Sequence, residues 1–329
     1  MHLPIRATLL IMATTFATAA FAQTDPRLAE VTAFFAQADV RAGPDIVDCT
    51  LSEGAETTCF SITLAADPQA YTPGPWCPTN VSDGPEEGGI WFLDGETVDV
   101  DGAFITRLAE IYGDDKWQLF DSDTGEIRYT GTLEACEAAA RPDVDPAYQN
   151  YCVQCLPEQL PKEAIMTFVI PLEPVAASAP AQTNRTGSGI AYNGVRLDGP
   201  APLDAILGAY TIAPFDDCGG HANPFVGYHY HAVTDCLDAS PAVAADASEG
   251  AAIGIAMDGY PILPNLLADG SEPASLDACN GHAGADGEYH YHVGKAGANA
   301  ILGCMTAQAG CTQEDANGIC NAAARGPRP

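Results

Sequence analysis

The chain has 329 residues, with 13 Lys and Arg against 44 Asp and Glu, which gives a formal net charge of −31 at pH 7. Such a charge repels nucleic-acid phosphates and anionic membrane surfaces, so we expect neither as a partner. The length fits two domains better than one.

Residues 1–22 have the pattern of a secretory signal peptide. Arg6 is followed by an apolar run from Ala7 to Ala20, and a small-x-small pattern places the cleavage after Ala22. No later apolar run approaches the roughly 18 residues that are needed to span a bilayer. We therefore expect a soluble protein that is periplasmic or secreted, without membrane insertion.

The part that follows is predicted to contain short helices and a hairpin. A helix is expected within residues 24–38, because Asp25 is a suitable N-cap and Pro26 suits the first helical position. The periodicity and the stop signals also predict a helix at 102–112 (capped by Asp101 and ended by Gly113), a hairpin at 117–130 and a helix at 132–141.

Strands dominate the predictions for the rest of the chain. Residues 164–172 form a β-branched apolar run, which predicts a strand, and the small and polar residues of 176–187 predict a loop. Beyond them the sequence is rich in glycine and short strand-like pieces. The predicted fold is mainly β: a barrel or sandwich built from two related halves, preceded by a smaller disulfide-rich α+β domain. The predicted boundaries are 23–160 and 161–329.

The second domain contains an internal repeat. Asp-x-Cys-x-Gly-His at 216–221, followed by Tyr-His-Tyr-His at 228–231, recurs with a constant offset of 61 residues at 277–282 and 289–292. Residues 189–195 also parallel 254–260, so the two copies span about 189–236 and 254–304. We expect them to pack about a pseudo-two-fold axis, because neither copy buries its apolar face alone.

The copies contain every histidine of the chain except His2, which falls in the predicted signal peptide. These six candidate metal ligands are His221, His229, His231, His282, His290 and His292. Residues i and i+2 of a strand share a face about 6–7 Å apart, so both histidines of a Tyr-His-Tyr-His run can reach one ion. Three histidine nitrogens with an open fourth position are typical of catalytic zinc and histidine-bound copper. We predict copper or zinc, in one site per copy or in a shared site on the axis.

Several further residues are candidates for supporting roles. Asp216 and Asp277 are candidates for orienting an imidazole or acting as a base, and Asp258 is a candidate to face the site. In a copper-dependent oxidase, Tyr228 or Tyr289 would lie near the metal.

Twelve cysteines in an exported chain indicate up to six disulfides. Six precede residue 156 and six follow residue 217, so each part can close its own set. Cys218 and Cys279 are candidates for thiolate ligands, although disulfides to Cys236 and Cys304 are favoured. Structural pairing is also favoured over redox chemistry for Cys152 and Cys155, which have Cys-x-x-Cys spacing. The remaining disulfide candidates of the second part are Cys311 and Cys320.

At these motifs the sequence resembles the YHYH family of exported bacterial proteins. The resemblance covers roughly residues 164–304 and includes the paired Asp-x-Cys-x-Gly-His loops and the Asp-Gly-Tyr-Pro-Ile segment at 258–262. It implies metal binding and assigns no activity. In many family members another residue stands where this chain has His282, which implies that the two sites need not be equivalent.

Three functions follow as hypotheses. The first is an exported protein that holds copper or zinc through the two histidine repeats. The second is a periplasmic metal-dependent enzyme, either a zinc hydrolase or a copper-dependent oxidase. The third is a non-catalytic, disulfide-stabilised interaction module. A cleft beside an open coordination position would favour the enzyme, and a closed shell of four ligands would argue against it.

Overall fold

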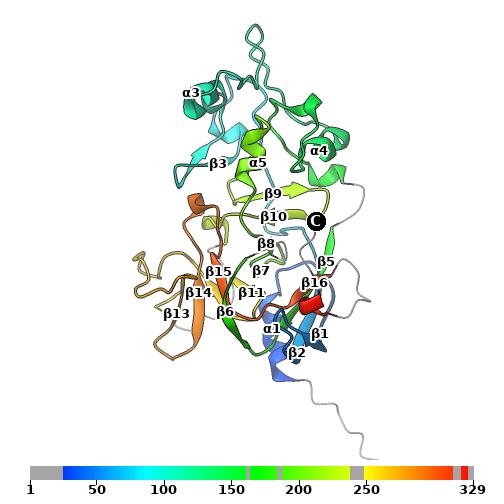
Figure 1. Cartoon of the computed structure of the whole chain (residues 1–329), viewed down its shortest axis with the longest axis vertical. Helices are drawn as coiled ribbons and strands as arrows, with labels where there is room; N and C mark the ends of the chain where they lie inside the picture. Colours follow the sequence, from blue (N-terminus) through cyan, green and yellow to red (C-terminus); the bar gives the residue numbers. More distant parts are fainter. Residues whose placement is uncertain (1–24, 161–163, 184–186, 238–247, 314–319, 325–329) are drawn as a thin grey trace, which may run out of the picture.

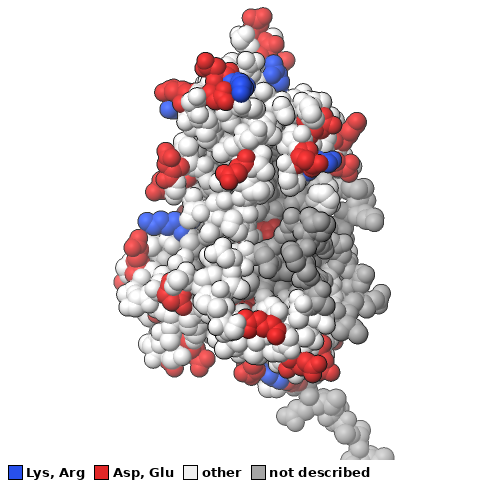
Figure 2. Space-filling model, viewed as in Figure 1, with Lys and Arg blue, Asp and Glu red and all other residues white. Residues whose placement is uncertain are grey.

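The computed structural model of the chain describes residues 25–160, 164–183, 187–237, 248–313 and 320–324. The predicted signal peptide at 1–22 lies outside these residues. Within them the protein is mainly β and disulfide-rich. No helix in the described ranges has the length and apolar character to cross a membrane. Acidic side chains extend from top to bottom of the face shown in Figure 2, with few basic ones among them.

An open eight-stranded sheet carries both copies of the histidine motif (Figure 1). Its strands, in spatial order, are β13 (Gly281–Ala283), β14 (Tyr289–His292), β12 (Pro261–Leu263), β11 (Gly254–Ala256), β7 (Gly189–Ala191), β8 (Arg196–Leu197), β10 (Gly227–Tyr230) and β9 (Gly220–Asn223). Read outward from the β7–β11 pair, the order is β7-β8-β10-β9 on one side and β11-β12-β14-β13 on the other. Both Tyr-His strands pair antiparallel with their loop strand and parallel with the strand on their other side. The sequence predicts a barrel or a sandwich; no closed barrel is found among the described residues, because this sheet has two edge strands, β9 and β13.

A second sheet contains strands from both the N-terminal and the C-terminal parts of the chain. Its strands are β1 (Val40–Thr50), β2 (Glu56–Ala65), β5 (Ile165–Pro171) and β16 (Cys311–Gln313), all antiparallel. Helix α1 (Pro26–Phe34) begins at the predicted N-cap, Asp25, and packs Val31 against the apolar cluster of this sheet. Because β2 pairs directly with β5, this sheet contains strands from both sides of the domain boundary that the sequence predicts at residue 160.

Strand β6 (Ala176–Gln182) lies where the sequence predicts a loop, and it pairs with β15 (Cys304–Ala307). Its side chains are almost all exposed, so no apolar pattern marks it. The pairing with a distant segment makes it a strand.

Short elements form the upper part of the molecule in Figure 1. They are β3 (Ile90–Leu93), β4 (Glu96–Asp99), α2 (Gly102–Thr106), α3 (Leu108–Tyr112), α4 (Leu133–Ala139) and α5 (Leu203–Gly208). The predicted helix at 102–112 has its predicted cap and end, but it breaks at Arg107 into α2 and α3. The predicted hairpin is reduced to a bridge between Phe120 and Ile127 with backbone bonds beside it.

The upper part is attached to the first copy through Phe215. Ile90 and Phe215 exchange backbone hydrogen bonds of 2.7 and 3.0 Å. The Phe215 ring stacks on Trp91 and Phe92, and its centroid lies 4.9 Å from that of His221. The segment that leads into the first Asp-x-Cys-x-Gly-His loop is therefore fixed by an aromatic core.

All twelve cysteines form disulfides within their own halves, as predicted. The pairs are Cys49–Cys59, Cys77–Cys152, Cys136–Cys155, Cys218–Cys236, Cys279–Cys304 and Cys311–Cys320. Cys152 and Cys155 thus have separate partners. Two of the disulfides, Cys218–Cys236 and Cys279–Cys304, join an Asp-x-Cys-x-Gly-His loop to the chain after its Tyr-His strand, which excludes these sulfurs as thiolate ligands.

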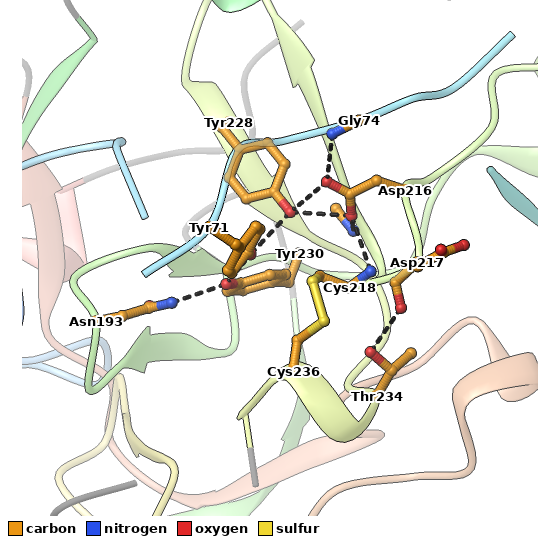
Figure 3. Close-up of a disulfide and its surroundings, with 11 residues drawn as sticks. Tyr71, Gly74, Asn193, Asp216, Asp217, Cys218, Tyr228, Tyr230, Thr234 and Cys236 are labelled. Atoms are coloured by element: carbon orange, nitrogen blue, oxygen red, sulfur yellow. Dashed lines mark hydrogen bonds between the residues drawn. A yellow bond between two sulfur atoms is a disulfide. The ribbon is translucent and has the colours of Figure 1, made fainter. Parts of the chain in front are cut away.

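Asp216 connects the first loop to the tyrosine face of β10 (Figure 3). Its carboxylate accepts hydrogen bonds from the backbone N–H of Cys218 (3.1 Å) and Gly220 (3.0 Å) and from the Tyr228 hydroxyl (2.8 Å). Gly74, from the N-terminal part, donates to the same carboxylate at 3.0 Å.

Asp277 repeats this arrangement in the second copy. It accepts from the N–H of Cys279 (2.8 Å) and Gly281 (3.0 Å) and from the Tyr289 hydroxyl (2.7 Å). Each aspartate therefore holds the loop that carries one histidine beside the Tyr-His strand that carries the other two histidines of its copy.

The other tyrosine of each run has a partner in the turn of its copy. Tyr230 accepts from Asn193 Nδ2 at 2.8 Å and bonds to Tyr71 (Figure 3), whereas Tyr291 donates to Asp258 Oδ2 at 2.7 Å. Asn193 and Asp258 occupy matching positions of the repeat. The same Asp258 oxygen accepts from the N–H of Ala307, so it also holds β15.

The loop glycines allow this close packing. A Cβ atom at Gly220 or Gly281 would overlap the hydroxyl of Tyr228 or Tyr289. We predict that Gly220→Ala and Gly281→Ala each lower the free energy of unfolding by about 1–3 kcal/mol, as overpacking does. Gly208→Ala is the control, because it adds a methyl group in open space in α5 and removes a helical glycine. Denaturant unfolding checks this, and equal stability of all three variants would contradict the packing described.

Asp258 predicts a pH dependence of stability. Burial raises the pKa of this carboxyl from 3.8 to about 6. The folded state therefore binds the proton of Asp258 more tightly than the unfolded state does. The contribution of this group to the free energy of unfolding is fully present below pH 3.8 and is lost as the pH rises through about 6. The loss is of the order of 3 kcal/mol.

Asp258→Asn removes this titration while keeping an oxygen for Tyr291. The stability of the variant relative to the wild-type protein should therefore increase between about pH 4 and 7. Denaturant unfolding over that range measures the difference, and a difference that stays constant with pH would contradict a raised pKa.

Candidate metal centres

The structure brings the three predicted histidines of each copy together in two separate groups of described residues. The first centre is His221, His229 and His231. The second centre is His282, His290 and His292, with Glu249 as a fourth member.

Cross-strand pairing produces both groups. His221 on β9 lies opposite His229 on β10, and His282 on β13 lies opposite His290 on β14. The alternation of side chains along a strand places the third histidine of each group on the same face. Ring centroids are 4.8, 5.0 and 4.9 Å apart in the first centre and 4.7, 5.2 and 5.1 Å apart in the second.

Backbone carbonyls hold the imidazoles in one tautomer. Nδ1 of His231 lies 2.7 Å from the Gly199 oxygen, and Nδ1 of His292 lies 2.7 Å from the matching Pro264 oxygen. His229 and His282 make the same kind of bond, to the oxygens of Gly227 and Ala274. A carbonyl only accepts, so each Nδ1 carries the proton and each Nε2 presents a lone pair.

In the second centre these lone pairs converge on Glu249. Its Oε2 atom lies 3.6, 3.8 and 3.4 Å from Nε2 of His282, His290 and His292. Nε2 of His282 and His292 are 3.3 Å apart. Glu249 Oε2 and His290 Nε2 are buried and have no hydrogen-bond partner among the described residues. Lone pairs that face one another in this way repel unless a cation lies between them.

The donor set fits a transition metal. Bonds of about 2.0–2.1 Å in a tetrahedron place neighbouring ligand atoms roughly 3.3–3.4 Å apart. The 3.3–3.8 Å separations in the second centre are close to that value. Three imidazoles and one carboxylate therefore form a nearly complete four-ligand shell.

Burial favours the neutral form of five of the six imidazoles, and the neutral form is the one that binds metals. It lowers the pKa of all three histidines of the first centre, and neighbouring imidazoles lower the pKa of His221 and His229 further. Burial also lowers the pKa of His290 and His292.

The first centre has no carboxylate in the position of Glu249. Asp198 is the nearest acid, with Oδ2 3.9 Å from Nε2 of His229, and it pairs through Oδ1 with Arg196 at 2.8 Å. All three histidines line a cavity of about 580 Å³ between the sheet and helices α4 and α5. In Figure 1, β9 and β10 lie directly below these helices. The fourth position of the first centre thus faces a space large enough for a small molecule.

The acidic and tyrosine candidates lie on the other face of the Tyr-His strands. The hydrogen bonds of Asp216, Asp277 and Asp258 run to backbone N–H groups and to tyrosine hydroxyls. Strand alternation turns Tyr228 and Tyr289 away from the imidazoles that flank them. The geometry therefore gives these five residues a part in building the loops.

Three residues at the centres are not among the sequence candidates: Glu249, Arg196 and Asp198. Glu249 lies 33 residues before His282, between the two copies, where no motif marks it. Arg196 and Asp198 follow the Asn-Gly turn of the first copy, at positions where the second copy has Pro261 and Leu263. Comparing the two copies would have identified this charged pair as a difference between them.

Comparison with known proteins supports the resemblance seen in the motifs. A family described as "YHYH protein" matches residues 167–275. The match includes most of β5 and the first centre and ends before the histidines of the second. No curated protein and no solved structure matches the chain. At residues 167–275 the chain is thus similar to the YHYH protein family.

Proposed function

We propose that this chain is an exported protein that binds two transition-metal ions, copper or zinc, one at each histidine centre. The observation that carries the proposal is the second centre. There, three imidazole lone pairs and the buried Oε2 atom of Glu249 face one another without hydrogen-bond donors between them. Ion binding would satisfy all four groups at once.

The donor sets also indicate which metals fit. Three neutral imidazoles and one carboxylate near tetrahedral spacing suit Zn²⁺ at the second centre. The first centre has only nitrogen donors in its cluster, and these bind Cu²⁺ more tightly than Zn²⁺. We therefore assign zinc to the second centre, and copper or zinc to the first.

Two further features support export and duplication. Six disulfides and the absence of a free cysteine fit an oxidising compartment. The matching strand order, histidine spacing and Nδ1–carbonyl bonds support two copies related by a pseudo-two-fold axis.

The stoichiometry of binding tests the proposal. Metal-free protein, titrated with Zn²⁺ against a chromophoric chelator, should bind two ions per chain. His229→Ala/His231→Ala and His290→Ala/His292→Ala should each bind one, and the remaining centre reports that the variant is folded. If the wild-type protein bound no zinc with a dissociation constant below about one micromolar, the proposal would be contradicted, and the hypothesis of a non-catalytic interaction module would be favoured.

Replacing Glu249 tests the closed shell of the second centre. Glu249→Gln keeps the size of the side chain but removes the charged ligand, so it should weaken one of the two zinc sites about 10- to 100-fold. Glu272→Gln is the matched control, because Glu272 is exposed and only forms an ion pair with Lys295. Equal zinc affinities in the wild-type protein and Glu249→Gln would exclude this carboxylate as a ligand.

The cavity favours a second candidate function, a metal-dependent enzyme at the first centre. A bound ion would supply Lewis acidity and an activated water. Around it, the carbonyls of Gly199 and Gly227 orient the imidazoles, and Asp198 is the nearest group that could accept a proton. The four-ligand second centre offers no such open position.

A further inference from the structure

The cavity above the first centre has the dimensions of a small-molecule site. Its volume of about 580 Å³ lies within the range of about 300–1,000 Å³ that is typical of such sites. The three histidines form part of its wall, and the opposite wall comes from α4, α5 and the segments beside them. A ligand in this space would therefore be in contact with the metal centre.

The lining of the cavity is less acidic than the protein as a whole. The charged residues that line it are Arg141, Arg196 and Asp198, in a chain whose net charge is −31. Arg196 forms an ion pair with Asp198, and Arg141 forms one with Asp143. A divalent ion on the three imidazoles would therefore supply the uncompensated positive charge of the cavity. With that ion bound, the cavity is a place where this acidic protein can attract an anion.

The rest of the lining is mostly apolar. Trp76, Val153 and Ile206 contribute to the interior, and Phe225 and Val226 contribute from the β9–β10 turn. Phe225 is 75% exposed, the highest value among the exposed large apolar side chains of the described residues. An apolar molecule would cover this ring.

These features belong to the first copy alone. Arg196 and Asp198 correspond to Pro261 and Leu263, as the parallel pairing of β8 with β10 and of β12 with β14 shows. At the constant offset of 61 residues, Phe225 and Val226 correspond to Asp286 and Gly287. Where the copies differ in this way, the second has Glu249 as a fourth metal donor and the first has the cavity.

We propose that this cavity binds a small organic anion, with its charged group toward the first centre and its apolar body against Trp76 and Phe225. The inference rests on the metal binding proposed above. A simple inorganic anion would leave the apolar walls exposed to water, and a neutral apolar molecule would leave the positive charge unpaired.

Naphthalene-2-acetate is a suitable probe, because it combines a carboxylate with an apolar body. Its affinity for the zinc-loaded protein, measured by calorimetry, is expected to be at least about tenfold higher than that of acetate or of neutral naphthalene-2-acetamide. His229→Ala/His231→Ala should abolish this preference, whereas His290→Ala/His292→Ala should keep it.

Variants away from the metal ligands separate the two parts of the site. Phe225→Ala should weaken binding of the probe about fivefold without changing that of acetate, whereas Leu266→Ala, which shortens another exposed side chain, should have no effect. Arg141→Gln should weaken binding of both anions about two- to fivefold, and Arg107→Gln, outside the cavity, should not.

The outcomes are distinguishable. If zinc is not taken up, the proposed function and this inference fail together. If zinc binds at both centres but acetate, the amide and the probe have equal affinities, only the inference fails. Unchanged binding of the probe by Phe225→Ala would likewise overturn the placement of the apolar body.

Discussion

The alternation of side chains along β10 and β14 is the constraint on which both centres depend. Each Tyr-His-Tyr-His run places two imidazoles on one face and two phenols on the other, and all of these side chains are buried except that of Tyr289, which is half-buried. The first phenol of each run is anchored by Asp216 or Asp277, which also holds the backbone of the loop that carries the third histidine. The tyrosine side therefore fixes the position of the histidine side.

The same frame holds two different centres. Both have the same tautomers and nearly the same ring spacings, because the loop, the strand and the carbonyl behind each imidazole are repeated. They differ in what lies at the fourth position: Glu249 in the second copy and a cavity in the first. A centre with four donors holds an ion tightly and leaves little room for exchange, whereas a centre with three donors accepts a ligand from outside. The proposed metal binding therefore gives the second copy a closed site and the first copy an open one.

The sequence predicted the features that follow from local pattern. The period of Tyr-His-Tyr-His identified the shared face of the histidines, and the caps at Asp25 and Asp101 identified two helix starts. It did not predict the features that depend on contacts between distant segments. Glu249 reaches the second centre from outside the repeat, β6 is a strand only through its pairing with β15, and the cavity requires α4 and α5 to lie over β9 and β10. For the same reason the sequence left a barrel and a sandwich as alternatives, whereas the strands of the two copies form one open sheet.

Anomalous diffraction at the zinc edge, from crystals of the zinc-loaded protein, tests the central claim most directly. Two peaks per chain are predicted. One would be bound by Nε2 of His282, His290 and His292 and by Oε2 of Glu249, and the other by Nε2 of His221, His229 and His231 with a ligand from the cavity. Crystals without a peak at either trio, with the imidazoles hydrogen-bonded only to protein or water, would show that the histidines are structural and would contradict the account.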